Sequence, residues 1–349
     1  MNNYFCVLPF FSYEVDQTNS KNIYCCRLAP GTDINQVQQS ILNQQRAPEC
    51  STCWKLEDSG NPSERQIHNN TFDYYADRDL ELIEQDVRNG QYQTKIVKLS
   101  TSNLCNGTCV TCNHAASSAW AALENRPIDY KKIPESTLDN IDWKEITQLS
   151  FVGGEPLLEK KNFQILQNLI EQHNTDCFVS IVTNGSVELS ATQVDILSKF
   201  PKLNICLSID GVANSFEYMR WPLQWNTLTK NINLFKQQAQ HVSVSCMISN
   251  LNVMHFDQII DFFKEQDIDY LCKQIDYPSY FAPGNLPPDY KQLVLKHNSK
   301  HQDLIQGFLQ CGQYSPELFQ RCWTEINRQD SLKKINIENY LPEFSLTRI

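Results

Sequence analysis

Short apolar runs alternate with amphipathic stretches along the chain from residue 95 onward. In the amphipathic stretches, apolar residues recur at i, i+3, i+4 and i+7, which is the spacing of helices that pack on a sheet. Strict alternation of strand and helix indicates an α/β protein with a parallel sheet, right-handed crossovers and ligands at the carboxyl ends of the strands. The β-branched runs predict six strands, at residues 96–102, 146–154, 178–185, 203–211, 242–249 and roughly 270–276.

The two ends of the chain differ from this alternating region. Residues 3–15 and 22–28 predict a β-hairpin around a polar turn, followed by a helix near 33–45 and a loop that carries cysteines. A further helix ends at Gly90. After a proline-rich connection the C-terminal part is predicted to be mostly helical. We therefore expect three parts: an N-terminal α+β module at 1–94, a core at 95–280 and a helical extension at 281–349.

Composition and charge narrow the functional classes. The chain has 349 residues, of which 41% are hydrophobic, and a net charge of -10, so a surface that binds nucleic acid is not expected. The apolar runs are far shorter than the roughly 20 residues needed to span a bilayer, and the start of the chain has no signal-peptide pattern. We therefore expect a cytoplasmic protein without a membrane partner. Fourteen cysteines in such a chain indicate metal ligation rather than a disulfide framework.

Three of these cysteines lie within eight positions, directly after the first predicted strand of the core. Cys105, Cys109 and Cys112 are too close in sequence to occupy separate elements, so their thiols are expected to surround one object. A structural zinc site needs four protein ligands, and among the neighbours only His114 could be the fourth. An iron–sulfur cubane held by three thiolates keeps one iron open. This is the arrangement needed when a substrate must coordinate the metal.

A second group of cysteines lies near the N-terminus. Cys50 and Cys53 form a two-thiol loop, Cys6 belongs to one strand of the predicted hairpin, and Cys25 and Cys26 end the other strand. Adjacent residues of a strand point to opposite faces, so one of the last two is expected to bind, with Cys26 the substitute for Cys25. Four thiolates without an open position suit either zinc or a second iron–sulfur cluster.

The spacing of Cys105, Cys109 and Cys112 after a strand resembles the signature of the radical S-adenosylmethionine (SAM) superfamily. Thr111 stands where that family usually has an aromatic residue. The stretch FVGGEP at 151–156 follows the second strand and also resembles the family. The resemblance implies a partial (β/α)6 barrel, a [4Fe–4S] cluster on the three cysteines, and SAM bound through its amino group at Gly153, Gly154 and Glu155.

Later strand ends continue the resemblance. The third strand ends in VTNGS, where Thr183 and Asn184 are expected to contact the ribose or backbone groups. The fourth strand ends in LSIDG. A guanidinium pairs with a carboxylate in a bidentate manner, so Arg220 is the expected partner of the SAM carboxylate. The fifth strand ends where the family stacks an apolar residue on adenine. The remaining expected cofactor-binding residues are Ser208, Asp210 and Ile248.

The N-terminal segments FCVLPF, IYCCR and ECSTCWKLEDSGNPSER resemble the SPASM module and its shortened twitch form, which carry auxiliary clusters in peptide-modifying radical SAM enzymes. Here the module precedes the core. The resemblance implies an auxiliary [4Fe–4S] cluster. Its ligands would be Cys6, Cys25, Cys50 and Cys53.

The expected activity is reductive cleavage of SAM and modification of a peptide, in particular a ribosomally synthesised precursor that is crosslinked, epimerised, excised or oxidised. The resemblance implies an external one-electron donor such as flavodoxin or ferredoxin, and allows a separate precursor-recognition protein. One alternative is a radical SAM enzyme that acts on a small molecule, and another is an iron–sulfur or zinc redox sensor without catalysis. No spacing selects a hydrogen donor among the candidates Cys311, Cys322, Tyr277 and Tyr280.

Overall fold

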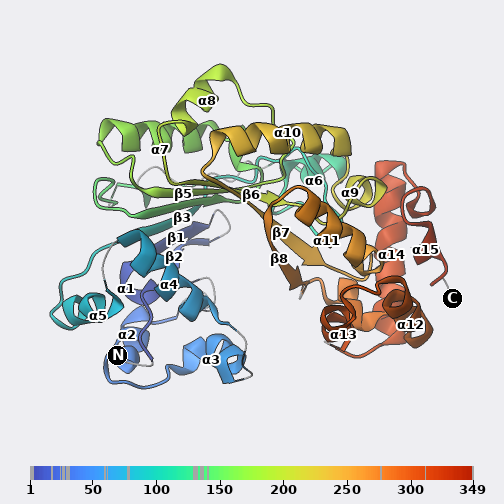
Figure 1. Cartoon of the computed structure of the whole chain (residues 1–349), viewed down its shortest axis with the longest axis horizontal. Coiled ribbons are helices and arrows are strands. Elements are labelled where there is room, and N and C mark those ends of the chain that lie inside the picture. Colours follow the sequence, from blue (N-terminus) through green and yellow to red (C-terminus); the bar gives the residue numbers. More distant parts are fainter. Residues whose placement is uncertain are drawn as a thin grey trace. The chain divides into compact units, whose positions relative to one another are not determined.

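One sheet of eight strands organises the chain in the computed structural model, in the order β2-β1-β3-β4-β5-β6-β7-β8 (Figure 1). The α/β class, the parallel sheet and the helical C-terminal region predicted from the sequence are confirmed. No helix in the described part of the chain is both long and apolar enough to cross a membrane. The structure describes residues 4–347 apart from 17–18, 24, 26–27, 29–31, 59, 61, 77–78, 129–132, 134–136, 140, 276 and 311.

All six predicted core strands are present. Five are shorter than the sequence pattern predicts, and the fifth, His241–Ile248, has the predicted length and begins one residue earlier. In β5 and β6 every second residue is buried, which is why the period-two pattern located them. β3 pairs in parallel with β4, and β7 pairs in parallel with β8. The strands are β3 (Ile96–Ser100), β4 (Gln148–Val152), β5 (Phe178–Thr183), β6 (Leu203–Ser208), β7 (His241–Ile248) and β8 (Asp269–Gln274).

The N-terminal hairpin is shorter than predicted, and it extends the core sheet. Its strands β1 (Ser12–Asp16) and β2 (Asn19–Ile23) are antiparallel, while β1 pairs in parallel with β3, with Tyr13 opposite Val97. The first half of the predicted strand is instead the helix α1 (Leu8–Phe11), where Pro9 lies in the first turn and all four side chains are buried. Because β1 and β3 are far apart in the sequence, no local sequence pattern predicts that they pair.

The chain divides into two compact units. Unit 1 comprises residues 1–103, 130–181 and 189–204, and unit 2 comprises residues 104–129, 182–188 and 205–349. In unit 1, Val7, Phe10 and Phe11 pack in one buried cluster with side chains of α2 and α5. The helices of unit 1 after α1 are α2 (Ile34–Leu42), α3 (Ser51–Asp58), α4 (Glu64–Ala76), α5 (Leu80–Arg88), α7 (Lys160–Glu171) and α8 (Ala191–Leu197).

One face of the unit 1 strands carries a row of polar side chains. Glu14 is in register with Lys98, and their side chains form an ion pair of 2.8 Å. Ser150 is the next register partner, followed by Ser180, whose hydroxyl accepts a hydrogen bond of 3.2 Å from the Asn204 amide. Register partners in a sheet share a face. A parallel sheet that is covered on both faces is normally apolar on both. Unit 1 instead presents polar side chains on one face of its strands.

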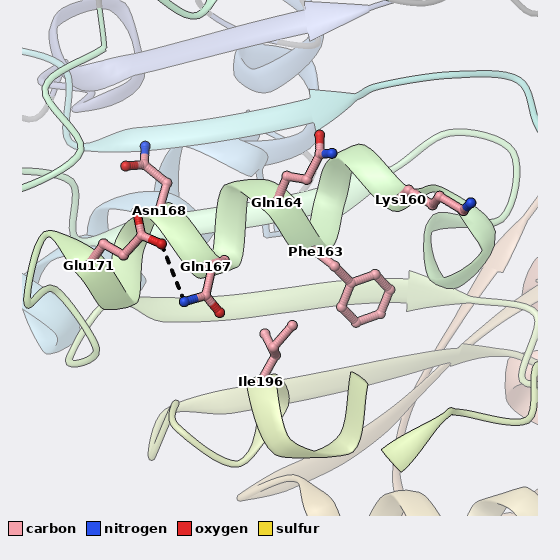
Figure 2. Close-up of a pocket in the computed structure, with 7 residues that line it drawn as sticks. All are labelled: Lys160, Phe163, Gln164, Gln167, Asn168, Glu171 and Ile196. Carbon is pink, nitrogen blue, oxygen red and sulfur yellow. Dashed lines mark hydrogen bonds between the residues drawn. The ribbon is translucent and has the colours of Figure 1, made fainter. Parts of the chain in front are cut away.

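A shallow pocket along α7 shows no sign of a catalytic or metal-binding site. It is lined by Lys160, Phe163, Gln164, Gln167, Asn168, Glu171 and, from α8, Ile196 (Figure 2). Gln167 Nε2 donates a weak hydrogen bond of 3.4 Å to Glu171 Oε1 one helical turn away. No cysteine or histidine lines it, so we assign no site to this surface.

Unit 2 contains the remaining strands and most of the C-terminal helices. The longest, α14, begins after Ser315, whose Oγ accepts a hydrogen bond from Leu318 N at 3.2 Å, and has Pro316 in its first turn. It ends at Lys334 in the left-handed conformation. The helices of unit 2 are α6 (Ser118–Leu123), α9 (Asn214–Met219), α10 (Trp225–Gln238), α11 (Phe256–Glu265), α12 (Pro288–His297), α13 (Gln302–Gln310), α14 (Pro316–Lys333) and α15 (Pro342–Ser345).

Candidate active site

The three-cysteine loop is fixed by hydrogen bonds from its own backbone. Thr108 N donates to Trp221 O at 2.7 Å, and Val110 N donates to Met219 O at 2.9 Å, which ties the loop to the end of α9. At the other side, the start of α6 closes the loop, because Ser117 Oγ donates to Gly107 O at 2.7 Å. The backbone that carries the thiols is therefore held independently of any ligand.

Two thiols of this loop, those of Cys105 and Cys109, lie beside the same space at Gly107. A Cβ atom at Gly107 would lie 3.6 Å from Cys109 Sγ and 3.9 Å from Cys105 Sγ, so the missing side chain leaves room between these two sulfurs. Burial raises the pKa of the Cys112 thiol to about 12, and the nearby Cys109 adds to this shift. All three cysteines are free of disulfides. Thiols that gather around an open space fit an iron–sulfur cluster, which would displace their protons on binding.

Arg220 places a positive charge beside this loop. Its Nη2 lies 2.6 Å from Asp210 Oδ2, and its Nη1 is 3.9 Å from Cys109 Sγ. Although burial disfavours the charge, the Asp210 carboxylate raises the pKa of Arg220, so the guanidinium stays protonated. Its buried Nε has no hydrogen-bond partner in the described part of the chain. A buried N–H without a partner is costly, and this one is a free donor for a ligand.

Asp210 is itself fixed from two sides. Its Oδ1 accepts a hydrogen bond of 2.8 Å from Met247 N at the end of β7, and its backbone oxygen accepts one of 2.8 Å from Asn252 Nδ2. Asn252 is a residue that sequence reasoning missed, because an asparagine in a loop after a strand is an ordinary turn residue. Together these contacts fix the orientation of Arg220 relative to Cys109.

The other predicted cofactor-binding residues of unit 2 lie at strand ends, as expected. Asn184 Nδ2 donates to Asn106 Oδ1 at 2.8 Å, which joins the end of β5 to the cysteine loop. Thr183 Oγ1 accepts a hydrogen bond of 3.1 Å from Gly185 N and so shapes the turn. Ser208 is half-buried at the end of β6, and Ile248 is fully buried at the end of β7.

The glycine turn after β4 lies in unit 1. Gly153 has φ +120°, and a Cβ atom there would lie 2.7 Å from Ser100 Oγ and 3.0 Å from Ser102 O. Gly154 N donates to Ser102 O at 3.2 Å. Glu155 is 1% exposed, and its Oε1 accepts a hydrogen bond of 3.1 Å from Leu157 N, so its carboxylate also caps the short helix that follows.

Replacing Gly153 with alanine is expected to destabilise the protein by about 1–3 kcal/mol, because the added methyl group meets backbone and the φ is unsuited to an L residue. The matched control is Gly307→Ala in α13, where nothing lies within 4 Å of the added atom. The control is expected to stabilise the chain by about 0.5–1 kcal/mol. Urea unfolding of both variants measures this. Equal midpoints for the two would show that the turn does not depend on Gly153.

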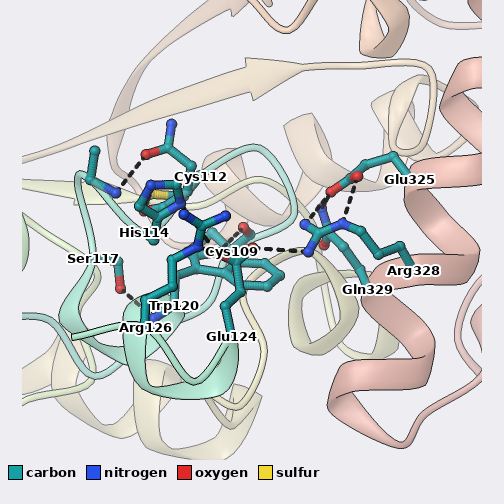
Figure 3. Close-up of polar contacts among 12 residues, drawn as sticks. Cys109, Cys112, His114, Ser117, Trp120, Glu124, Arg126, Glu325, Arg328 and Gln329 are labelled. Atoms are coloured by element: carbon teal, nitrogen blue, oxygen red, sulfur yellow. Dashed lines mark hydrogen bonds and ion pairs between the residues drawn. The ribbon is translucent and has the colours of Figure 1, made fainter. Parts of the chain in front are cut away.

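Sequence reasoning missed the contribution of α14 to the cysteine loop. Gln329 Nε2 donates to Val110 O at 2.9 Å, and Arg328 Nη1 lies 2.8 Å from Glu124 Oε1 (Figure 3). The indole of Trp120 donates to Cys109 O at 3.0 Å. Gln329 and Val110 are 219 positions apart, so no sequence spacing could reveal this contact.

His114, the possible fourth zinc ligand, is engaged elsewhere. Its Nδ1 lies 3.1 Å from Glu124 Oε2, and Arg126 contacts the same carboxylate at 2.9 Å (Figure 3). In the described residues, no three His, Cys, Asp or Glu side chains meet closely enough to hold a single metal ion.

The N-terminal cysteines line one pocket in unit 1. Cys6, Cys25, Cys50 and Cys53 share this pocket with apolar residues, Trp54 and Arg65. Burial raises the pKa of Cys6 to about 12, and burial together with Cys53 raises that of Cys50 to about 11. Cys26 lies outside the described residues. Four thiols that line one mostly apolar pocket fit a fully ligated cluster.

Trp54 and Arg65 line this pocket and contact each other. The Trp54 indole donates to Ala47 O at 3.1 Å, and the Arg65 guanidinium lies 4.9 Å from the centre of its ring. Arg65 also donates to the backbone oxygen of Phe5, next to Cys6, at 2.9 Å, and pairs with Glu57. These contacts hold the segments that carry Cys6 and Cys53 together.

The candidate hydrogen donors occupy different environments. Cys322 is fully buried, and its sulfur accepts a hydrogen bond of 3.3 Å from Asn250. Tyr277 is 81% exposed, and Tyr280 stacks under Arg321 at 5.2 Å. Cys311 lies outside the described residues. None of these contacts selects a donor.

Comparison with known proteins adds a family match. The model of the Radical SAM superfamily matches residues 99–263. No curated protein matches the chain. Among solved structures, the chain is similar to native anSMEcpe with bound AdoMet, at 20% identity over 63% of this chain and 63% of that chain, with a TM-score of 0.44. It is also similar to Streptococcus suis SuiB bound to precursor peptide SuiA, at 12% identity over 92% of this chain and 69% of that chain, with a TM-score of 0.41. The chain spans less than two thirds of the anSMEcpe structure's length.

Proposed function

We propose that this chain is a radical SAM enzyme in which Cys105, Cys109 and Cys112 hold a [4Fe–4S] cluster that would bind SAM at its open iron. The match of the superfamily model to residues 99–263 supports this proposal. When bound, the cluster and SAM supply one-electron cleavage of the sulfonium bond and, through the 5′-deoxyadenosyl radical, hydrogen abstraction from a substrate C–H bond. The electron comes from an external donor such as flavodoxin or ferredoxin.

The observation that carries this proposal is the loop itself. Cys105 and Cys109 flank one space at Gly107, and Cys112 lies close enough to interact electrostatically with both, on a backbone that is anchored at Thr108 and Val110. The free Nε of Arg220 next to Cys109 supports binding of a carboxylate ligand, since a guanidinium N–H is a strong donor to that group. Arg220 thus orients the carboxylate ligand and balances its negative charge.

We assign an auxiliary [4Fe–4S] cluster to the N-terminal pocket, with Cys6, Cys25, Cys50 and Cys53 as ligands. The wild-type chain is then expected to hold roughly eight irons after anaerobic reconstitution. The Cys50→Ala/Cys53→Ala variant is expected to hold about four and to keep the SAM-responsive cluster. Iron and zinc analysis measures this. A content of four irons and one zinc per wild-type chain would show that the N-terminal pocket holds zinc and not an auxiliary cluster.

We propose a peptide as the substrate. An extended peptide can pair with the terminal strand of a sheet, and the sheet ends in β2 and β8. The β8 edge carries exposed apolar side chains, with Leu271 50% and Tyr270 39% exposed, and an edge of this kind favours addition of a further strand. The sequence resemblance to SPASM and twitch proteins supports the same class of substrate.

Anaerobic turnover tests the proposal. The reconstituted chain is reduced with dithionite and given SAM together with the short peptides encoded beside its gene, and 5′-deoxyadenosine and peptide mass are measured. We expect 5′-deoxyadenosine in every assay and a mass change in one peptide. Cleavage without a change in any peptide would favour a small-molecule substrate. No cleavage at all would contradict the enzyme assignment of the cysteine loop.

A further inference from the structure

A buried lysine at the end of α14 lies next to the cysteine loop. Lys333 is 4% exposed, and its Nζ donates to Gln329 Oε1 at 2.9 Å. The same Nζ lies 4.8 Å from the centre of the Trp120 ring. Because Gln329 donates to Val110 O and Trp120 donates to Cys109 O, both partners of Lys333 are themselves bound to the loop.

This ammonium group has no carboxylate at ion-pair distance in the described part of the chain. An isolated buried charge costs several kcal/mol, so buried lysines are normally paired. Burial lowers the pKa of Lys333 to about 8, while the neighbouring Cys109, Asp330 and Glu325 act in the other direction. At neutral pH most of the side chain therefore stays charged, with Cys109 of the loop among the groups that favour its charge.

The neighbouring cation of the same helix shows the contrast. Arg328 lies 5.6 Å from the same Trp120 ring, but its side chain is 43% exposed. It contacts Glu124 at 2.8 Å and Glu325 at 2.6 Å, so its charge is neutralised by two carboxylates. Both cations thus meet one indole, but Arg328 has two carboxylates at ion-pair distance, whereas Lys333 has none in the part of the chain that the structure describes.

We propose that Lys333 is the fixed counter-charge of the cluster held by Cys105, Cys109 and Cys112, and that it raises the reduction potential of that cluster. This inference rests on the proposed function. Reduction adds one negative charge to a cluster that already carries three thiolates, and a nearby cation stabilises the reduced form more than the oxidised form. Lys333 is a positioning residue in this account, since it acts through the electrostatics of the site.

The experiment is a redox titration of the reconstituted full-length chain, followed by the EPR signal that changes on addition of SAM. In Lys333→Met we expect the ratio of reduced to oxidised cluster at a fixed potential to fall about tenfold. This corresponds to a lowering of the midpoint potential by about 59 mV for one electron. Lys333→Arg keeps the charge and is expected to stay close to wild type. Arg328→Met is the matched control and is expected to leave the midpoint unchanged.

Each result decides the question. An unchanged midpoint in Lys333→Met with full iron content overturns the inference, and so does an equal shift in Arg328→Met. If Lys333→Met takes up no cluster, loading of Lys333→Arg but not of Lys333→Gln supports the charge requirement, and failure of Lys333→Arg as well shows a packing role. A wild-type chain without any SAM-responsive signal contradicts the proposed function instead.

Discussion

Replacing Cys109 with alanine is expected to abolish SAM cleavage. The thiol is one of the three proposed cluster ligands and its sulfur lies beside the space at Gly107, and a cluster left with two protein thiolates is not held there. The backbone of the loop does not depend on this side chain, because Cys109 O still accepts from Trp120 and Val110 N still donates to Met219 O. The loss is measured as 5′-deoxyadenosine formed after reduction with dithionite.

Cys177→Ala is the matched control for this variant. Cys177 is 1% exposed and forms no disulfide, so its replacement also removes one thiol, but from outside the loop. We expect this control to keep the wild-type rate of SAM cleavage and the full iron content. Undiminished cleavage by Cys109→Ala would remove the basis of the proposed function.

Replacing Arg220 with methionine is expected to have the largest effect on stability. Asp210 is 2% exposed, and Arg220 is its ion-pair partner at 2.6 Å. Removing one partner of a buried ion pair leaves an uncompensated charge and costs about 3–5 kcal/mol. Urea unfolding of the full-length chain measures the change in the free energy of unfolding.

The double variant Asp210→Asn/Arg220→Met separates the stranded charge from lost packing. Asparagine can still accept the hydrogen bond from Met247 N, but it carries no charge to strand. We therefore expect the double variant to recover most of the stability lost in Arg220→Met. A single variant that loses less than about 1 kcal/mol would show that the pair is effectively solvated.

Local patterns in the sequence predicted the parts of the molecule that depend on short spacing. The alternating burial of β5 and β6 follows the period-two pattern of their residues. The convergence of Cys105 and Cys109 follows from a loop of three residues with Gly107 between them. In both cases neighbours along the chain decide the geometry, so the sequence contains the information.

Long-range contacts could not be predicted in the same way. The pairing of β1 with β3 depends on two segments separated by β2 and the helices α2 to α5, and neither carries a residue that identifies the other. The same holds for Arg220. The family resemblance predicted that Arg220 contacts a ligand, but not that it forms an ion pair with Asp210. Lys333 lies in a helix whose sequence shows only an ordinary charged pattern, and its burial emerges from packing against Trp120.

The central claim is that one iron at the cysteine loop lacks a protein ligand and binds SAM directly. Electron–nuclear double resonance on the reduced, reconstituted chain with SAM labelled with ¹⁵N in its amino group tests it. The account predicts a hyperfine coupling between the labelled nitrogen and the cluster, and its loss in Cys109→Ala. A reduced cluster with bound SAM and no such coupling would contradict the account.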